Sequence, residues 1–335
     1  MSEKYVVIGL GSMGKRRVRC LLALGVRPED IWGIDVREDR RCEALEKYGI
    51  HVTNEEKNID FGNIRGVIVS LAPDKHAFGV DIALRHNKPA FIEASVVLDD
   101  VRKIEDNNKS GVFMAPSCTM LFHPMIKEIK RIVKDKIYGK TCNFSYHSGQ
   151  YLPDWHPWED VKDYYVSNRE TGGAREIVPF EMTWMADVFG LPRAIKGYFR
   201  QTGKIGCEIE DSYACCLDYG DMTGTLLVDV VSRFATRNLI INFEQAQLRW
   251  AWEKKAIEIY EADTGNWKYI QQGEQKAENG YNENIVEDMY VDEIKAFLAG
   301  IDDADKYPNN LTKDISVLKF LTMLEESDGG FSEGK

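Results

Sequence analysis

The chain has 335 residues, a formal net charge of −11 at pH 7, and 44% hydrophobic and 29% charged residues. This length exceeds what one hydrophobic core usually holds, so two domains are expected. The acidic balance argues against binding nucleic acid through its phosphate backbone. The first residues, MSEKYVVIGLG, carry no secretion signal, and no apolar run reaches the ~18 residues of a membrane span. Seven scattered cysteines without a CxxC pair indicate reduced thiols, so we expect a cytoplasmic protein without membrane contact.

Short apolar segments alternate with helical patterns over the first third of the chain. Continuous apolar runs of this kind are typical of strands buried on both faces, and their alternation with helices predicts a doubly wound parallel sheet. Strands are expected at residues 5–8, 31–34, 66–70, 90–93 and 112–114, and helices from residue 15 and over 42–48, 76–86 and 101–107.

The pattern changes after about residue 120. Strand-like segments follow one another there with few helices between them, which predicts an antiparallel sheet. The expected fold is α/β, with a Rossmann domain over 1–120 and an α/β domain with a large, open, mostly antiparallel sheet over 121–335. Strands are expected at 142–146, 194–199, 212–217, 224–231, 238–243, 247–252 and 256–260, and helices at 124–133, 179–189, 288–298 and 312–323.

The segment GLGSMG at 9–14 predicts a dinucleotide site, because it follows a strand, opens a helix and precedes an acid at the end of the next strand. Gly9 permits the tight turn, Gly11 leaves room for the pyrophosphate, and Gly14 lets the helix pack closely. Asp35 is expected to bind the ribose hydroxyls, which favours NAD over NADP, although Arg37 would favour NADP. The cations at 15–17 are expected to face solvent or a bound phosphate.

Five segments extend this interpretation: VVIGLGSMG at 6–14, SLAPDKHA at 70–77, KPAFIEAS at 88–95, LFHP at 121–124 and TGGA at 171–174. With them the chain resembles the glucose–fructose oxidoreductase/inositol dehydrogenase (Gfo/Idh/MocA) family. The resemblance implies an NAD-dependent oxidoreductase of carbohydrate metabolism that acts on a CH–OH carbon. It also implies a homodimer or homotetramer formed through the C-terminal sheet, and it adds Ser12, Met13, Leu71, Ala72, His76 and Glu93 to the cofactor-binding candidates.

The chain departs from that family at its catalytic positions. Where the family carries Glu-Lys-Pro, this chain has Glu93-Ala94-Ser95, so the lysine near the reacting carbon is missing. In the stretch GGAREIVPFE at 172–181, the family's aspartate corresponds to Ile177, and its histidine to Phe180 or, with a register shift of one, to Glu181. The resemblance therefore supports the nucleotide site but leaves the proton-transfer residues open.

Three residues are candidates to replace these groups: Glu181, Tyr164 and His156. Glu181 lies closest to the family's histidine position, but it is also placed to stabilise the start of a helix, where Pro179 suits the first turn. The aromatic and polar segment 150–169 suits a sugar ring, or alternatively a packed loop or subunit contact. The candidates for substrate binding are Tyr151, Trp158, Tyr165, Arg169, Arg175 and Glu176.

Arg169 and Arg175 together suit a carboxylate or phosphate of the substrate, which favours an acidic sugar or sugar nucleotide; alternatively each is a salt-bridge partner. No cluster with metal-ligand spacing is present. Three functions stay open: an NAD-dependent oxidoreductase with non-standard acid/base residues, a catalytically retired NAD-binding sugar sensor or scaffold, and a redox-neutral, epimerase-like enzyme that holds NAD tightly.

Overall fold

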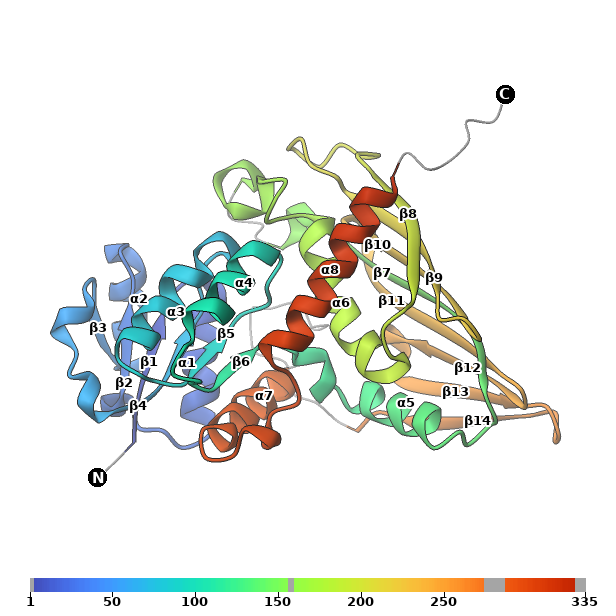
Figure 1. The fold of residues 1–335 in the computed structure, drawn as a ribbon, viewed down its shortest axis with the longest axis horizontal. Helices are drawn as coiled ribbons and strands as arrows, with labels where there is room; N and C mark the ends of the chain where they lie inside the picture. The colour runs from blue at the N-terminus through green and yellow to red at the C-terminus, as the bar shows by residue number, and fades with distance from the viewer. Residues whose placement is uncertain (1–2, 156–159, 274–286, 329–335) are drawn as a thin grey trace. The chain divides into compact units, whose positions relative to one another are not determined.

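The computed structural model describes residues 3–155, 160–273 and 287–328 (Figure 1). The chain divides into two compact units, Met1–Phe122 with Glu287–Ile315, and His123–Val286 with Ser316–Lys335. The predicted boundary near residue 120 is therefore close to Phe122, where the chain first passes from one unit to the other. The prediction that 121–335 forms one continuous domain is wrong, because Glu287–Ile315 returns to the first unit.

The first unit is built on a six-stranded sheet in the order β3-β2-β1-β4-β5-β6, and all its strands are parallel. This is the predicted Rossmann arrangement. β3 was not expected, because its three residues offer too short a pattern. The strands are β1 (Lys4–Ile8), β2 (Ile31–Ile34), β3 (His51–Thr53), β4 (Ile64–Val69), β5 (Ala90–Ile92) and β6 (Met114–Pro116).

Five helices of the described chain belong wholly to this unit, and their apolar sides bury the sheet's central strands. Val7, Ile68 and Phe91 of the strands pack in one cluster with Leu21 and Phe297 of the helices. Phe297 comes from the returning segment, which explains why that segment joins this core. The helices are α1 (Ser12–Ala23), α2 (Glu38–Tyr48), α3 (His76–Arg85), α4 (Leu98–Asn107) and α7 (Glu287–Gly300).

The second unit contains an eight-stranded sheet in the order β14-β13-β12-β11-β7-β10-β9-β8. Neighbouring strands pair antiparallel except β10 and β7, which run parallel, so the sheet is mostly antiparallel as predicted. β14 was not expected, because its residues are largely exposed and lack an apolar alternation. The strands are β7 (Thr141–Tyr151), β8 (Ala194–Arg200), β9 (Ser212–Asp218), β10 (Thr223–Asp229), β11 (Val231–Phe243), β12 (Ala246–Ala251), β13 (Ala256–Glu261) and β14 (Asn266–Gln271).

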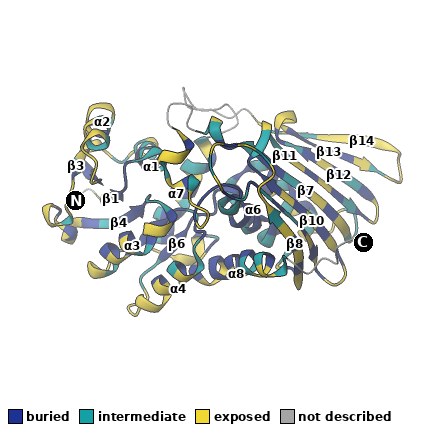
Figure 2. Ribbon diagram, turned by 90° about the horizontal axis from the view of Figure 1, so that it is seen from above, coloured by how far each residue is buried: buried dark blue, intermediate teal, exposed yellow. Residues whose placement is uncertain are grey.

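One face of this sheet is covered by α5 (Pro124–Lys134) and α6 (Ala174–Phe189), as Figure 1 shows, and we call it the inner face. Buried and exposed residues alternate along the strands (Figure 2): on β10, Leu226 and Val228 are buried while Leu227 is exposed. The prediction that α6 begins at Pro179 is wrong. The helix starts five residues earlier and contains the proline, which removes one backbone donor without ending the helix.

The last helix, α8 (Leu311–Ser327), begins in the first unit and continues in the second. Within the described parts of the chain, no helix combines the length and the apolar character needed to cross a membrane.

Candidate functional site

The turn between β1 and α1 is shaped by glycines at two positions where a side chain would collide with backbone. Gly9 has φ +90°, and a Cβ there would lie 2.5 Å from the Ser70 carbonyl oxygen. A Cβ on Gly14 would lie 1.8 Å from the Gly9 carbonyl oxygen. Both residues must therefore be glycine for α1 to pack this closely on the strands, as the sequence predicted.

Gly11 differs from these two glycines because a Cβ there would meet only a side chain and no backbone. The nearest atom to a Cβ built there is Nη1 of Arg40, at 3.4 Å, which is the mobile end of a side chain. Gly11 also caps the twelve-residue helix α1, whose first turn contains Ser12 and Met13. The backbone N–H groups and positive dipole end of this turn favour an anion, so the turn fits a diphosphate.

Asp35 follows β2 and its carboxylate is held in place by backbone. Oδ2 accepts a hydrogen bond from Leu10 N at 2.7 Å, and Oδ1 accepts one from Arg37 N at 2.9 Å. Each carboxylate oxygen accepts two hydrogen bonds, so capacity remains for two ribose hydroxyls. The Arg37 guanidinium instead contacts Asp39 at 2.6 Å. A second cation lies closer to the Asp35 carboxylate: Nη1 of Arg40 is 3.8 Å from Asp35 Oδ2.

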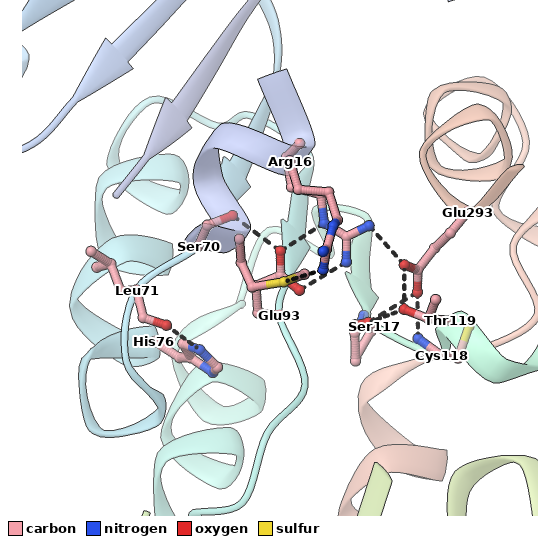
Figure 3. Close-up of polar contacts among 12 residues, drawn as sticks. Arg16, Ser70, Leu71, His76, Glu93, Ser117, Cys118, Thr119 and Glu293 are labelled. Atoms are coloured by element: carbon pink, nitrogen blue, oxygen red, sulfur yellow. Dashed lines mark hydrogen bonds and ion pairs between the residues drawn. The ribbon is translucent and has the colours of Figure 1, made fainter. Parts of the chain in front are cut away.

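The candidates at the carboxyl ends of β4 and β5 make contacts within the first unit (Figure 3). The Nε2 atom of His76 lies 3.1 Å from the carbonyl oxygen of Leu71, and Glu93 accepts a hydrogen bond from the Ser70 hydroxyl at 3.1 Å. Burial lowers the pKa of His76, so its imidazole is neutral at pH 7. Ala72 precedes the short turn Pro73–Lys75. His76 and Leu71 thus brace the segment that follows β4.

Arg17 is fully buried and donates hydrogen bonds to the carboxylates of Glu93 and Glu293. We call these three residues the Arg17 cluster. The Nε and Nη2 atoms of Arg17 donate to Glu93 at 2.7 and 2.8 Å, and Nη1 donates to Glu293 of α7 at 2.9 Å. Glu293 also accepts from Ser117, Thr119 and the backbone N–H of Cys118 (Figure 3). The prediction that the cations at 15–17 face solvent or phosphate is wrong for Arg17, and for Arg16, which is also buried.

In the second unit, Glu181 of α6 is fully buried on the inner face of the sheet. Its carboxylate accepts hydrogen bonds from Tyr146, Ser148, Trp184 and Arg237 at 2.7–2.9 Å, and we call these five residues the Glu181 cluster. Four donors fill the lone-pair sites that a carboxylate offers. This saturation favours a structural role for Glu181 over the acid/base role expected from the sequence.

Arg237 was missed by the sequence analysis. Its guanidinium carbon lies 4.8 Å from the centre of the Trp252 ring, and Trp252 lies beside His123, whose Nδ1 accepts from Met125 N at 3.3 Å. Burial and the Arg237 charge lower the pKa of His123 to about 3, so this histidine is neutral. A lone arginine within a strand pattern gives no signal that could have identified it.

Tyr165 and Glu176 lie together at the start of α6. The Tyr165 hydroxyl donates to Glu176 at 3.4 Å, and the rings of Tyr164 and Tyr165 lie 6.1 Å apart at 82°. Burial raises the pKa of Glu176 to about 8, so its carboxyl is mostly protonated at pH 7. A carboxyl that exchanges its proton near neutral pH suits acid/base chemistry better than Glu181 does. His156 and Trp158 lie outside the described residues.

The remaining substrate candidates have partners of their own. Tyr151 packs under the guanidinium of Arg233, 3.7 Å from the ring centre. Arg169 pairs with Glu210, and Arg175 pairs with Glu325 at 2.7 Å. The prediction that the two arginines jointly clamp a substrate anion is therefore not supported, and the alternative of separate salt bridges is observed. Among the described residues, no group of three His, Cys, Asp or Glu side chains is arranged to hold a metal ion.

The sequence matches no protein-family model and no curated protein. Solved structures share the fold over nearly the whole chain. An oxidoreductase from Agrobacterium radiobacter, crystallised with NAD+, L-tartaric acid and magnesium, has a TM-score of 0.84 at 11% identity and covers 99% of this chain and 98% of its own. Levoglucosan dehydrogenase with NADH and levoglucosan has a TM-score of 0.82 at 13% identity, with coverage of 99% and 98%. UDP-N-acetylglucosamine 3-dehydrogenase from Acidithiobacillus ferrooxidans has a TM-score of 0.77 at 11% identity and covers 98% of both chains.

Proposed function

We propose that this protein is an NAD-dependent oxidoreductase that acts on a hydroxyl or keto carbon of a sugar, acidic sugar or sugar nucleotide. The observation that carries the proposal is the glycine turn, in which Gly9 and Gly14 are forced by packing, Gly11 caps α1, and Leu10 N donates to the Asp35 carboxylate. Structures of the same fold were solved with NAD+ or NADH and with levoglucosan, which supports the cofactor and the substrate class.

In this proposal, different residues of the first unit bind different parts of the cofactor. The N-terminal turn of α1 binds the diphosphate, and Asp35 accepts hydrogen bonds from the adenosine ribose. Bound NAD supplies the acceptor for a hydride. A 2′-phosphate beside Asp35 would meet the negative charge of this carboxylate, which Arg40, 3.8 Å away, offsets in part, while Arg37 is paired with Asp39; NAD is therefore preferred to NADP.

The proposal is tested in two steps. Isothermal titration with NAD and with NADP measures the affinity for each cofactor. NADH fluorescence then reports turnover with levoglucosan, L-tartrate and UDP-N-acetylglucosamine, which represent an anhydrosugar, an acidic substrate and a sugar nucleotide. Absence of heat with either cofactor contradicts the nucleotide site, and cofactor binding without turnover of a wider sugar panel contradicts the oxidoreductase role.

The saturated Glu181 cluster and the alanine at position 94 favour a second candidate, an NAD-binding sensor or scaffold without turnover. Two measurements separate it from the first. A sensor binds sugar and NAD together without producing NADH, whereas an oxidoreductase produces NADH in proportion to the sugar consumed. An epimerase-like enzyme would convert the sugar while its tightly held NAD returns to the oxidised form.

We also propose that the outer face of the eight-stranded sheet, opposite α5 and α6, forms a homodimer or homotetramer. Large apolar side chains are exposed there on several strands: Tyr198, Leu227, Ile240 and Tyr260. An exposed apolar surface of this kind is typical of a protein interface. The double variant L227K/I240K should lower the mass measured by sedimentation without unfolding the chain; an unchanged mass contradicts this interface.

A further inference from the structure

The six residues after Asp35 contain three arginines, and the structure gives each of them a different contact. Arg37 forms an ion pair with Asp39 at the surface, with 2.6 Å between Nη2 and the carboxylate. Arg41 donates from Nη1 to the backbone carbonyl oxygen of Asp35 at 2.8 Å, which fixes the chain just after β2. Two of the three arginines are therefore already bonded to groups of the protein.

The third arginine, Arg40 in the first turn of α2, is not bonded in this way. Its Nη1 atom lies 3.8 Å from Oδ2 of Asp35, which is too long for a hydrogen bond. The guanidinium donates no hydrogen bond within the part of the chain that the structure describes. The Arg40 side chain is 37% exposed, whereas that of Asp35 is 6% exposed. Arg40 therefore keeps its donors for a group outside the protein.

Arg40 lies beside both parts of the proposed nucleotide site. Its Nη1 and Cζ atoms are 3.4 and 3.8 Å from the point that a Cβ on Gly11 would occupy. Gly11 caps α1, whose N-terminal turn fits the diphosphate, and the Asp35 carboxylate is placed for the ribose hydroxyls. A dinucleotide held at both places brings its adenosine ribose next to this guanidinium. In NADP, the 2′-hydroxyl of that ribose carries a phosphate.

We propose that Arg40 binds the 2′-phosphate of NADP, so that the site accepts NADP as a weaker second cofactor beside NAD. The proposal rests on the proposed nucleotide site. A planar guanidinium pairs with a phosphate through two N–H groups at once. Asp35 repels the phosphate because both are negative, and Arg40 offsets this repulsion. Since NAD has no 2′-phosphate, Arg40 changes the ratio of the two affinities and not the affinity for NAD.

The test compares ligands that differ only in the 2′-phosphate. Isothermal titration measures the affinities of NADP and NAD, and of adenosine 2′,5′-bisphosphate and 5′-AMP, for the wild type and R40M. R40M should weaken binding of the two 2′-phosphorylated ligands about tenfold or more, because their charged hydrogen bonds are lost. It should change the affinities for NAD and 5′-AMP by less than about threefold. R40K, which keeps the charge without the planar fork, should lie between R40M and the wild type.

The matched control is R37M, which removes the same charge three residues earlier from an arginine that has a partner. Its ratio of NAD to NADP affinity should stay within about twofold of the wild-type ratio. Salt provides a second measurement. In the wild type, the affinity for NADP should fall more steeply with NaCl concentration than the affinity for NAD, and R40M should remove this difference. Urea midpoints of R40M and R37M establish that both variants are folded.

The outcomes separate this proposal from the proposed function. An unchanged NADP affinity in R40M contradicts the proposal, and so do equal losses for NAD and NADP, which would mean that Arg40 binds the diphosphate common to both. A wild type that binds NAD but gives no heat with NADP also contradicts it. A selective loss of NADP binding in R37M would assign the 2′-phosphate to Arg37 instead. All of these results leave the nucleotide site standing, which only the absence of heat with both cofactors contradicts.

Discussion

The Arg17 cluster and the Glu181 cluster both contain a fully buried charge, but they differ in what neutralises it. Arg17 is a cation between two carboxylates, and its partners Glu93 and Glu293 lie 76 and 276 residues along the chain. Glu181 is an anion held by one arginine and three neutral donors, all within 56 residues. The first cluster therefore joins α1, the end of β5 and the returning helix α7, whereas the second fixes one helix to one face of a sheet.

This difference shows why burial alone does not identify an acid/base group. Both clusters surround their charged groups with donors or with opposite charge. Glu176 is half-buried and Asp314 of α8 is buried, each with few donors, and their pKa values rise to about 8 and about 7. The sparsely bonded carboxyls, rather than the well-bonded ones, are suited to exchange protons at neutral pH.

The largest effect should follow from removing the charge of the Arg17 cluster. R17M leaves Glu93 and Glu293 buried without their cation, so the free energy of unfolding should fall by about 3–5 kcal/mol. Urea denaturation measures it. The matched control R102M removes an arginine at the surface whose partner, Asp99, is also exposed, and should leave the urea midpoint close to that of the wild type. Equal urea midpoints for R17M and the wild type would show that the Arg17 cluster does not hold α1, the end of β5 and α7 together.

A smaller loss of stability is expected for E181Q. The glutamine keeps one acceptor oxygen but presents an NH2 group to two of the four donors, so the free energy of unfolding should fall by about 2 kcal/mol. The pH dependence of kcat should keep its wild-type shape, since a structural carboxylate does not supply the proton. A variant that is as stable as the wild type but has lost turnover would instead restore Glu181 as the acid/base group.

Binding of the cofactor should depend on Asp35 independently of both clusters. D35A removes a carboxylate that is placed for the ribose hydroxyls, so NAD affinity should fall at least about tenfold, and the preference over NADP should fall with it. Isothermal titration measures both affinities. E38A changes an exposed acid three residues away and is the control. An unchanged preference for NAD in D35A would contradict the role given to this carboxylate.

The raised pKa of Glu176 predicts that the free energy of unfolding depends on pH. Its folded pKa of about 8 exceeds the ordinary value of 4.5, so the folded state holds a proton that the unfolded state has released between these values. The wild type should therefore lose stability as pH rises from 4.5 to 8, and E176Q should lose less. Urea midpoints across this range measure the difference, and E170Q, at an exposed glutamate, is the control. Parallel curves for E176Q and the wild type would contradict the raised pKa.

The fold could be predicted from sequence where the pattern is local. The continuous apolar run of β1, the glycines that follow it and the alternation of β10 each depend on residues close together in the chain, and the structure confirms them. The return of α7 to the first unit depends on Phe297 packing with residues some 200 positions earlier, which no local pattern reveals. The start of α6 was predicted at Pro179 because proline is common in the first turn of a helix, but here Pro179 lies inside the helix.

The candidate site divides in the same way. The glycine turn and Asp35 follow a local motif and could be found from sequence. Arg17 lies within a run of three cations, which is usual on a surface, and its buried role depends on two distant glutamates. Asp314 belongs to a polar stretch at the start of a helix, and only the structure shows that it is buried. Chemistry that arises from long-range burial leaves no mark in a single sequence.

The smallest effects should come from the two arginines that were expected to act together. Arg175 and Glu325 are about four-fifths buried, so R175A should cost about 1 kcal/mol. Arg169 is largely exposed, so R169A should leave the urea midpoint unchanged. If the separate salt bridges are their whole role, neither variant alters KM for an acidic sugar relative to a neutral one. The opposite result is a rise in KM for the acidic sugar but not for the neutral one in both variants, with an effect in the double variant no larger than the sum of the two single effects. That result would mean that the arginines leave their partners to bind substrate.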